Sequence, residues 1–105
     1  MTDYIQVVTT TGSEDEAKLI GRALVERRLA ACVQTMGPIE SVYWWKEVIE
    51  TATEWQCVAK TKKNLFDASL KTINEFHSYD VPEILVVPVT DGCKPYLAWI
   101  DDQLR

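Results

Sequence analysis

One stretch decides the fold of this 105-residue chain: residues 30–61 read AACVQTMGPIESVYWWKEVIETATEWQCVAKT. Ala30–Met36 is extended in pattern, Gly37-Pro38 interrupts it as a bend or bulge would, and Ile39–Trp45 resumes it. A turn at Lys46-Glu47 then leads through Val48-Ile49 into a further strand from about Thr53 to Thr61. The stretch therefore predicts one long bent β-hairpin.

The segment before the hairpin predicts a strand and a helix. Tyr4–Thr10 is rich in β-branched residues and indicates the first strand. Ser13 and Glu16 have the spacing of a capping box, which starts a helix that ends near Arg28. One apolar stripe follows at helical spacing: Ala17, Ile20, Gly21 and Leu24.

The segment after the hairpin predicts a second helix, a strand and a terminal helix. Asn64 and Asp67 are spaced as N-cap and N3, before a stripe of Phe66, Leu70 and Ile73. Ile84–Val87 is continuously apolar, as in a central strand buried on both faces, and Pro88 closes it. Pro95 is typical of a helix start, and the residues from Tyr96 to Leu104 suggest a short C-terminal helix.

This order, βαββαβ with a terminal helix, predicts an α+β fold of the ferredoxin-like kind. Residues 1–105 suffice for a single domain, with helices on one face of an antiparallel sheet. The other face would be open in a monomer, and the hairpin would project beyond the domain.

The aromatic residues of the hairpin predict a partner subunit. Tyr43 and Trp45 share one face of their strand, and Trp44 takes the other. Each large aromatic side chain can bury about 150–250 Å², so leaving them in water forgoes several kcal/mol at roughly 25 cal/mol per Å². Burial in an interface is favoured over a wholly intramolecular cluster.

Charge and composition exclude several classes of protein. The net charge is −5, from 11 basic and 16 acidic residues, which argues against a nucleic-acid partner. No apolar run approaches the ~20 residues of a membrane span, and the first residues do not resemble a signal peptide. The prediction is a cytoplasmic protein whose Cys32, Cys57 and Cys93 are reduced thiols.

The residue types that could bind a metal are few. Cys32 and His77 are ligands of the kind that copper or zinc prefers, and His77 falls at a helix end near the carboxylates of Asp80 and Glu83. A histidine that only caps its helix fits the same position. Cys32 fits a buried strand thiol better than a ligand.

Five segments, in order along the chain, carry a family resemblance. They are Leu29–Val33, Ile39–Trp45, Lys60-Thr61, His77–Ile84 and Tyr96–Trp99. Together they resemble the CutA family of divalent-cation tolerance proteins. The resemblance implies a tight homotrimer like that of the PII signalling proteins, with hairpins forming intersubunit sheets, and a cytoplasmic role connected to copper and other divalent cations.

Three departures from the family pattern stand out. The family's hairpin usually turns with a Gly, whereas this chain has Lys46-Glu47, so the turn is expected to be wider or to use another conformation. Ser78 stands where Pro often follows the His. A family thiol position near the end of the first strand holds Thr9 or Thr10 here, which weakens a copper–thiolate site that includes Cys32.

The functional prediction is a non-enzymatic homotrimer that binds divalent cations weakly at intersubunit clefts, through His77, Cys32 and Glu83. No cofactor is obligatory; Cu²⁺ or another divalent cation is the candidate ligand. The alternative is a PII-like sensor of a small metabolite in clefts lined by Trp45, Tyr79, Glu83 and Trp99. His77 with Glu83 could form an acid–base pair, but no nucleophile stands in a triad or elbow setting.

Overall fold

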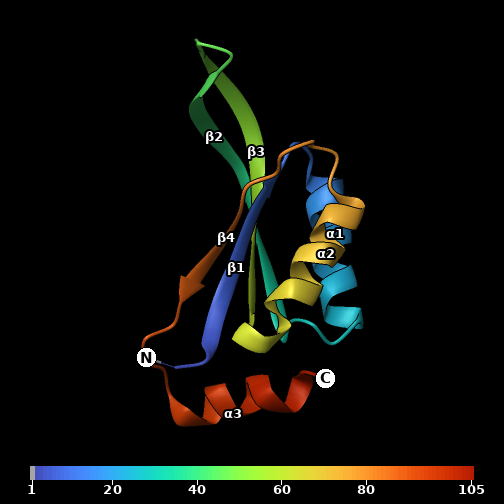
Figure 1. Ribbon diagram of the computed structural model, residues 1–105, viewed down its shortest axis with the longest axis vertical. Helices are drawn as coiled ribbons and strands as arrows, with labels where there is room; N and C mark the ends of the chain where they lie inside the picture. The colour runs from blue at the N-terminus through green and yellow to red at the C-terminus, as the bar shows by residue number, and fades with distance from the viewer. Residues whose placement is uncertain (1) are drawn as a thin grey trace.

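The protein is built on one four-stranded antiparallel sheet, seen in a computed structural model that describes residues 2–105 (Figure 1). The strand order is β2-β3-β1-β4, so β2 and β4 form the two edges. The strands are β1 (Tyr4–Thr11), β2 (Cys32–Trp45), β3 (Val48–Lys62) and β4 (Ile84–Pro88). This is the ferredoxin-like α+β arrangement that the order of elements predicts.

Two helices cover one face of the sheet, and a third lies across one of its ends (Figure 1). The first pair is α1 (Glu14–Glu26) and α2 (Phe66–Phe76), and the third is α3 (Lys94–Gln103). The helix start predicted at Ser13 is confirmed, because the Ser13 hydroxyl accepts a hydrogen bond from the Glu16 N–H at 3.2 Å. The Glu16 carboxylate bonds to Ser78 and does not complete the predicted capping box.

The apolar core lies between the sheet and the helices α1 and α2. From α1, Ile20 and Leu24 are fully buried, as their helical spacing predicts. Ile5 and Val7 of β1 and Ile73 of α2 meet them in the same cluster. Burial of this cluster against the sheet is what fixes the two helices on that face.

The hairpin of β2 and β3 is paired up to its tip, where Trp45 lies opposite Val48. A register shift between Met36 and Ile39 confirms the bulge expected at Gly37-Pro38. At Gly37 the indole of Trp55 occupies the space that any Cβ would need. The bulge thus lies where the indole of Trp55 packs against the backbone of Gly37.

The hairpin turn keeps the two-residue length without a glycine. Lys46 and Glu47 have φ of 50° and 66°, so both adopt the left-handed conformation. Both expectations are therefore wrong, because the turn is neither wider nor of another kind: positive φ at both central residues is the usual pattern of a two-residue hairpin turn. The left-handed backbone conformation is strained at both residues, and glycine would adopt it without that strain.

Two expectations about the segment after the hairpin are wrong. β4 is an edge strand, with Leu85, Val86 and Val87 between 42% and 56% exposed, so its apolar run is not buried on both faces. Asn64 does not cap α2, because a 3-10 turn (Lys63–Leu65) comes first. Leu65 is the N-cap residue of α2 and forms no side-chain capping hydrogen bond.

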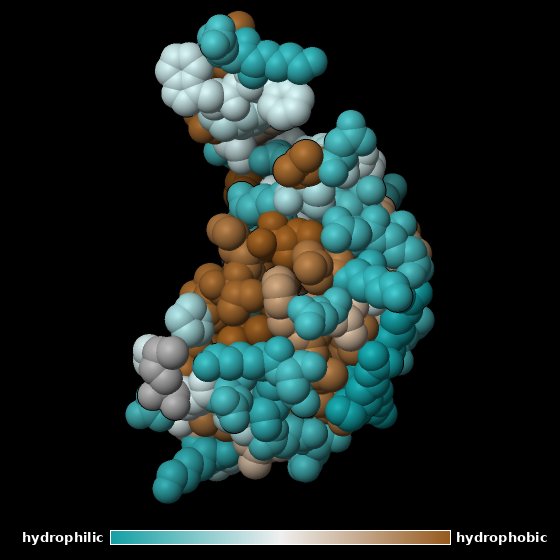
Figure 2. All heavy atoms as spheres, in the orientation of Figure 1, coloured by the Kyte–Doolittle hydropathy of each residue, from teal (hydrophilic) through white to brown (hydrophobic). Residues whose placement is uncertain are grey.

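Large apolar side chains remain on the surface of the single chain. Figure 2 shows them gathered in the hollow beside the projecting hairpin, over β4 and β1. Others lie at the hairpin tip, where Val42, Trp44, Val48 and Ile49 are 59–70% exposed. Exposed apolar patches of this kind mark contacts with other molecules.

Candidate functional site

The imidazole of His77 is fully buried at the end of α2, and both ring nitrogens have backbone partners. Nε2 lies 2.7 Å from the carbonyl oxygen of Thr10 in β1. Nδ1 accepts a hydrogen bond from the N–H of Tyr79 at 3.2 Å. Because a carbonyl only accepts, these partners assign the hydrogen to Nε2 and the lone pair of Nδ1 to the Tyr79 N–H.

Glu16 connects the loop after α2 to the first turn of α1. Its carboxylate accepts hydrogen bonds from the N–H of Ser78 at 3.0 Å and from the Ser78 hydroxyl at 3.2 Å. The same carboxylate lies 3.9 Å from Nδ1 of His77. The loop is thus held at its first residue by a side chain far away in the sequence.

Tyr79 continues this network to the hairpin. Its hydroxyl donates to Oε2 of Glu54 at 2.9 Å, and only 8% of Glu54 is exposed. Burial and the hydrogen bond to Glu54 raise the pKa of Tyr79 to about 12. Gly12 lies against the ring, since a Cβ there would come within 3.1 Å of the Tyr79 hydroxyl.

The predicted metal ligands do not meet within one chain. Cys32 pairs with Lys60 of β3, whereas Thr10, which holds His77, pairs with Gln56. Four residues along a strand separate the two points by about 13 Å. Glu83 is exposed just before β4, and no three His, Cys, Asp or Glu side chains among residues 2–105 are grouped to hold a metal. A single chain does not fit a closed metal centre.

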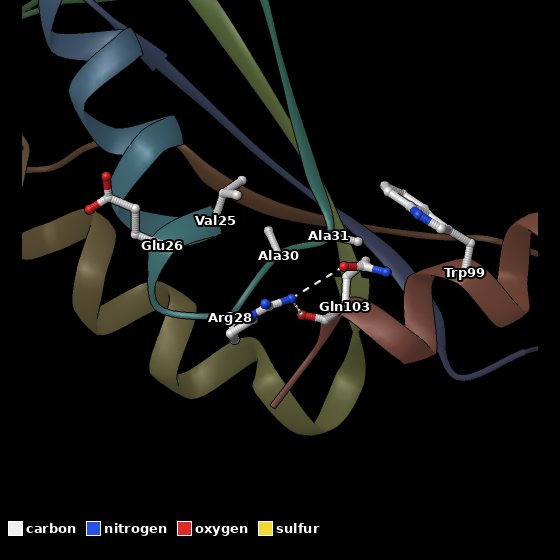
Figure 3. Close-up of a pocket in the computed structure, with 7 residues that line it drawn as sticks. All are labelled: Val25, Glu26, Arg28, Ala30, Ala31, Trp99 and Gln103. Atoms are coloured by element: carbon white, nitrogen blue, oxygen red, sulfur yellow. Dashed lines mark hydrogen bonds between the residues drawn. The ribbon is translucent and has the colours of Figure 1, made fainter.

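The predicted cleft residues are also far apart within one chain. Trp45 ends β2 at the hairpin tip, and Trp99 belongs to α3 at the opposite end of the molecule (Figure 1). The molecule is 45 Å along its longest axis. Tyr79 lies between them, on the loop after α2. Trp99 instead lines a cavity with Arg28 and Ala31 (Figure 3).

The three cysteines are free and have different surroundings. Cys32 is half-buried at the start of β2, and Cys93 is exposed. Cys57 is buried and donates from its thiol to the carbonyl oxygen of Ala17 at 3.4 Å. Burial raises the pKa of the Cys57 thiol, so it stays protonated and packs as a small apolar group.

Sequence analysis missed Glu16 and Glu54 as members of this network. Glu16 was interpreted only as part of a capping box, and Glu54 was not singled out. No local pattern identifies either, because their partners Ser78 and Tyr79 come from a distant loop.

Comparison with known proteins gives consistent matches over nearly the whole chain. Residues 5–103 match the family model described as CutA1 divalent ion tolerance protein. The divalent-cation tolerance protein CutA of Archaeoglobus fulgidus is 38% identical over 94% of this chain and 96% of its own length. The chloroplastic protein CutA 1 of rice is 35% identical over 96% of this chain, which spans only 57% of that relative.

Solved structures agree with the sequence matches. The crystal structure of CutA from Xylella fastidiosa superposes with a TM-score of 0.95, at 34% identity, over 99% of this chain and 100% of that one. CutA1 from Thermus thermophilus gives a TM-score of 0.94 at 33% identity, over 97% and 99% of the two chains.

Fold and site together define a ferredoxin-like protein with a long projecting hairpin and a loop anchored by His77, Glu16 and Glu54. The chain belongs to the CutA1 divalent ion tolerance family. The family's name describes tolerance of cations rather than catalysis. Among residues 2–105, no helix has the length and apolar character needed to cross a membrane.

Proposed function

We propose that the chain acts in divalent-cation tolerance as a non-enzymatic homotrimer, and that it binds cations weakly where subunits meet. Residues 1–105 serve as one domain in this proposal, and the setting is the cytoplasm. Cu²⁺ is the candidate cation, no cofactor is obligatory, and neither a nucleic acid nor a membrane takes part. The net charge of −5 suits a cationic ligand.

The apolar surface of the single chain carries the proposal of self-association. Trp44 at the hairpin tip is 70% exposed and Trp45 is 53% exposed. Leu85 on the edge strand β4 is 56% exposed and lies beside the apolar hollow. Burial of these side chains in a subunit interface gains several kcal/mol at roughly 25 cal/mol per Å².

Association also bears on the cation site. Cys32 lies on the edge strand β2 and Glu83 is exposed, so each is open to ligands from a neighbouring chain. His77 is less available, because a cation at Nδ1 must displace the Tyr79 N–H. Because no three candidate ligands among residues 2–105 are grouped in one chain, a site of this kind would form only when chains associate.

Light scattering tests the proposed trimer, and copper titration tests the proposed cation site. A mass three times that of the 12.0 kDa chain supports the trimer, and a stable monomer refutes it. Copper titration of Cys32→Ser and His77→Ala then compares affinity and stoichiometry with the unaltered protein. Cys93→Ser is the matched control, because Cys93 is an exposed thiol outside the proposed site. Equal binding by all variants removes Cys32 and His77 from the site.

A small-metabolite sensor of the PII-like kind is the second candidate function. It is favoured by the half-buried Tyr79–Glu54 pair, which offers a fixed hydrogen-bonding group rather than free metal ligands. In a trimer, clefts lined by Trp45, Tyr79, Glu83 and Trp99 would hold the metabolite. A thermal-shift screen of metals against nucleotides and amino acids separates the two functions, since only a bound ligand raises the melting temperature.

A further inference from the structure

A cavity of about 280 Å³ lies between the end of α1, the start of β2 and α3 (Figure 3). Its walls come from one chain, and they combine apolar, cationic and aromatic side chains. The residues used below are Val25, Arg28, Ala30, Ala31, Trp99 and Gln103. The volume matches the lower end of small-ligand pockets, which begin at about 300 Å³.

Arg28 lacks an acidic partner among residues 2–105. Its Nη1 donates to the backbone oxygen and to the side-chain oxygen of Gln103, both at 3.2 Å and both neutral. The neighbouring arginines differ, because Arg22 pairs with Glu26 at 2.6 Å and Arg27 with Glu75 at 2.9 Å. In a chain of net charge −5, Arg28 is a guanidinium without a carboxylate.

The one carboxylate at the cavity does not compensate Arg28. Glu26 lines the cavity, but its Oε1 forms the ion pair with Arg22. Nε and Nη2 of Arg28 have no hydrogen-bond partner among the described residues. Two donors of a planar fork remain open, which is the geometry that binds a carboxylate in a bidentate manner.

The backbone fixes where Arg28 stands. Its φ is 61°, which ends α1, and the N–H groups of Leu29 and Ala30 both bond to the carbonyl oxygen of Leu24. The N–H of Arg105 donates to the carbonyl oxygen of Arg28 at 3.0 Å. The guanidinium is thus placed at the cavity before any ligand arrives.

Trp99 provides a flat apolar wall. It is 41% exposed, and its indole stacks on Tyr96 with ring centroids 5.5 Å apart and planes at 28°. Figure 3 shows the indole standing beside Ala31, with Val25 on the α1 side. A flat apolar body would cover the exposed indole and the small side chains at once.

We propose that this cavity binds a small monocarboxylate with a flat apolar body, its carboxylate on Arg28 and its body against Trp99. Every group that this inference uses comes from a single chain, and of these groups only Trp99 is shared with the clefts proposed above. A ligand of benzoate size fits within the 280 Å³ of this cavity.

Titration with benzoate, followed by NMR, tests the site on the full chain. The indole N–H signal of Trp99 should shift with saturation, as should the backbone amides of Ala30 and Ala31. The indole signals of Trp44 and Trp45, at the hairpin tip, should not move. Benzamide, which has the same shape without the charge, should bind at least about tenfold more weakly, because it lacks the charge-assisted pair.

Variants assign the carboxylate to Arg28. Arg28→Asn keeps a residue that tolerates the left-handed conformation and should weaken benzoate binding about tenfold or more. Lys18→Gln removes the same charge from an exposed site on α1 and should leave binding unchanged. Trp99→Leu should weaken benzoate and benzamide alike.

Three results overturn the proposal. They are a Trp99 signal that does not shift with benzoate, equal affinity for benzamide, and an Arg28→Asn variant with a folded spectrum that binds benzoate as tightly as the unaltered protein. If Arg28→Asn does not fold, Arg28→Gln and the benzamide comparison decide the same point.

Discussion

Glu16 holds Ser78 through two hydrogen bonds, so the first turn of α1 and the loop after α2 form one unit. The two residues are 62 positions apart, and no other side chain among residues 2–105 holds the backbone N–H of Ser78. His77 and Tyr79, on either side of Ser78, are anchored to β1 and β3. The loop that carries the candidate site is therefore positioned by three elements.

Glu16→Ala should free this loop and lower the free energy of unfolding by about 1.5–3 kcal/mol, the usual loss for hydrogen bonds to a charged group. Hydrogen exchange at the amides of Ser78 and Tyr79 should accelerate. Glu14→Ala is the matched control in the same turn, since Glu14 forms only an exposed pair with Lys18. Equal exchange rates in the two variants would contradict the anchoring role of Glu16.

The Tyr79–Glu54 pair should make stability depend on alkaline pH. A pKa raised to about 12 means that the folded state holds the phenolic proton more tightly than the unfolded state, whose pKa is near 10. The contribution is complete below about pH 10 and is lost as the pH rises through about 12. The free energy of unfolding, measured by urea denaturation across this pH range, should fall less for Tyr79→Phe than for the unaltered protein.

Tyr4 contributes to the same alkaline loss of stability, so its share has to be separated from that of Tyr79. The pKa of Tyr4 is also raised, first by its hydrogen bond to Asp101, so part of the alkaline decline belongs to Tyr4. The double variant with Tyr4→Phe and Tyr79→Phe should lose more of the pH dependence than either change alone. A Tyr79→Phe profile that matches the unaltered protein would refute the assignment.

The hairpin turn should gain stability from glycine. Glu47→Gly removes the left-handed strain of a residue with φ of 66°, a cost of about 1 kcal/mol. Thermal unfolding should therefore occur at a higher temperature. Glu50→Gly is a control for which the opposite sign is expected. Glu50 is the third residue of β3, so glycine there should destabilise the protein by about 0.5–1 kcal/mol. A lower melting temperature for Glu47→Gly would show that Glu47 has another role in the turn.

Two leucines of α1 separate core packing from surface effects. Leu24 is 1% exposed in the core cluster, so Leu24→Ala should lower the free energy of unfolding by about 2–5 kcal/mol. Leu19 is 52% exposed, and Leu19→Ala should change it by about 0.5 kcal/mol or less. A large loss from Leu19→Ala, seen by urea denaturation, would instead place Leu19 in a subunit interface.

Local patterns sufficed to predict most of the fold. The N-cap at Ser13, the stripe that contains Ile20, and the bulge at Gly37 depend on residues close together in the sequence, and each is confirmed. The continuous apolar run Ile84–Val87 was misleading because an apolar run does not show whether its strand has neighbours on both sides. Hydropathy alone does not show which sheet edge a strand occupies.

The candidate site was harder to predict than the fold. His77 was identified from its position at a helix end, but its partners Thr10 and Glu16 depend on tertiary packing. Trp45 and Trp99 were grouped by residue type, yet they lie at opposite ends of one chain. Arg28 was missed because an unpaired charge is recognised only once the neighbouring ion pairs are known.

The sheet ends in β2 on one side and β4 on the other, and each edge has a neighbour on only one side within the chain. Copies joined head to tail, β2 of one to β4 of the next, always leave one edge of each kind free at the ends of the row. Growth stops only when the first and last copies meet. The angle at which copies join therefore separates a closed ring from a fibre, and a bend such as the one at Gly37 contributes to that angle.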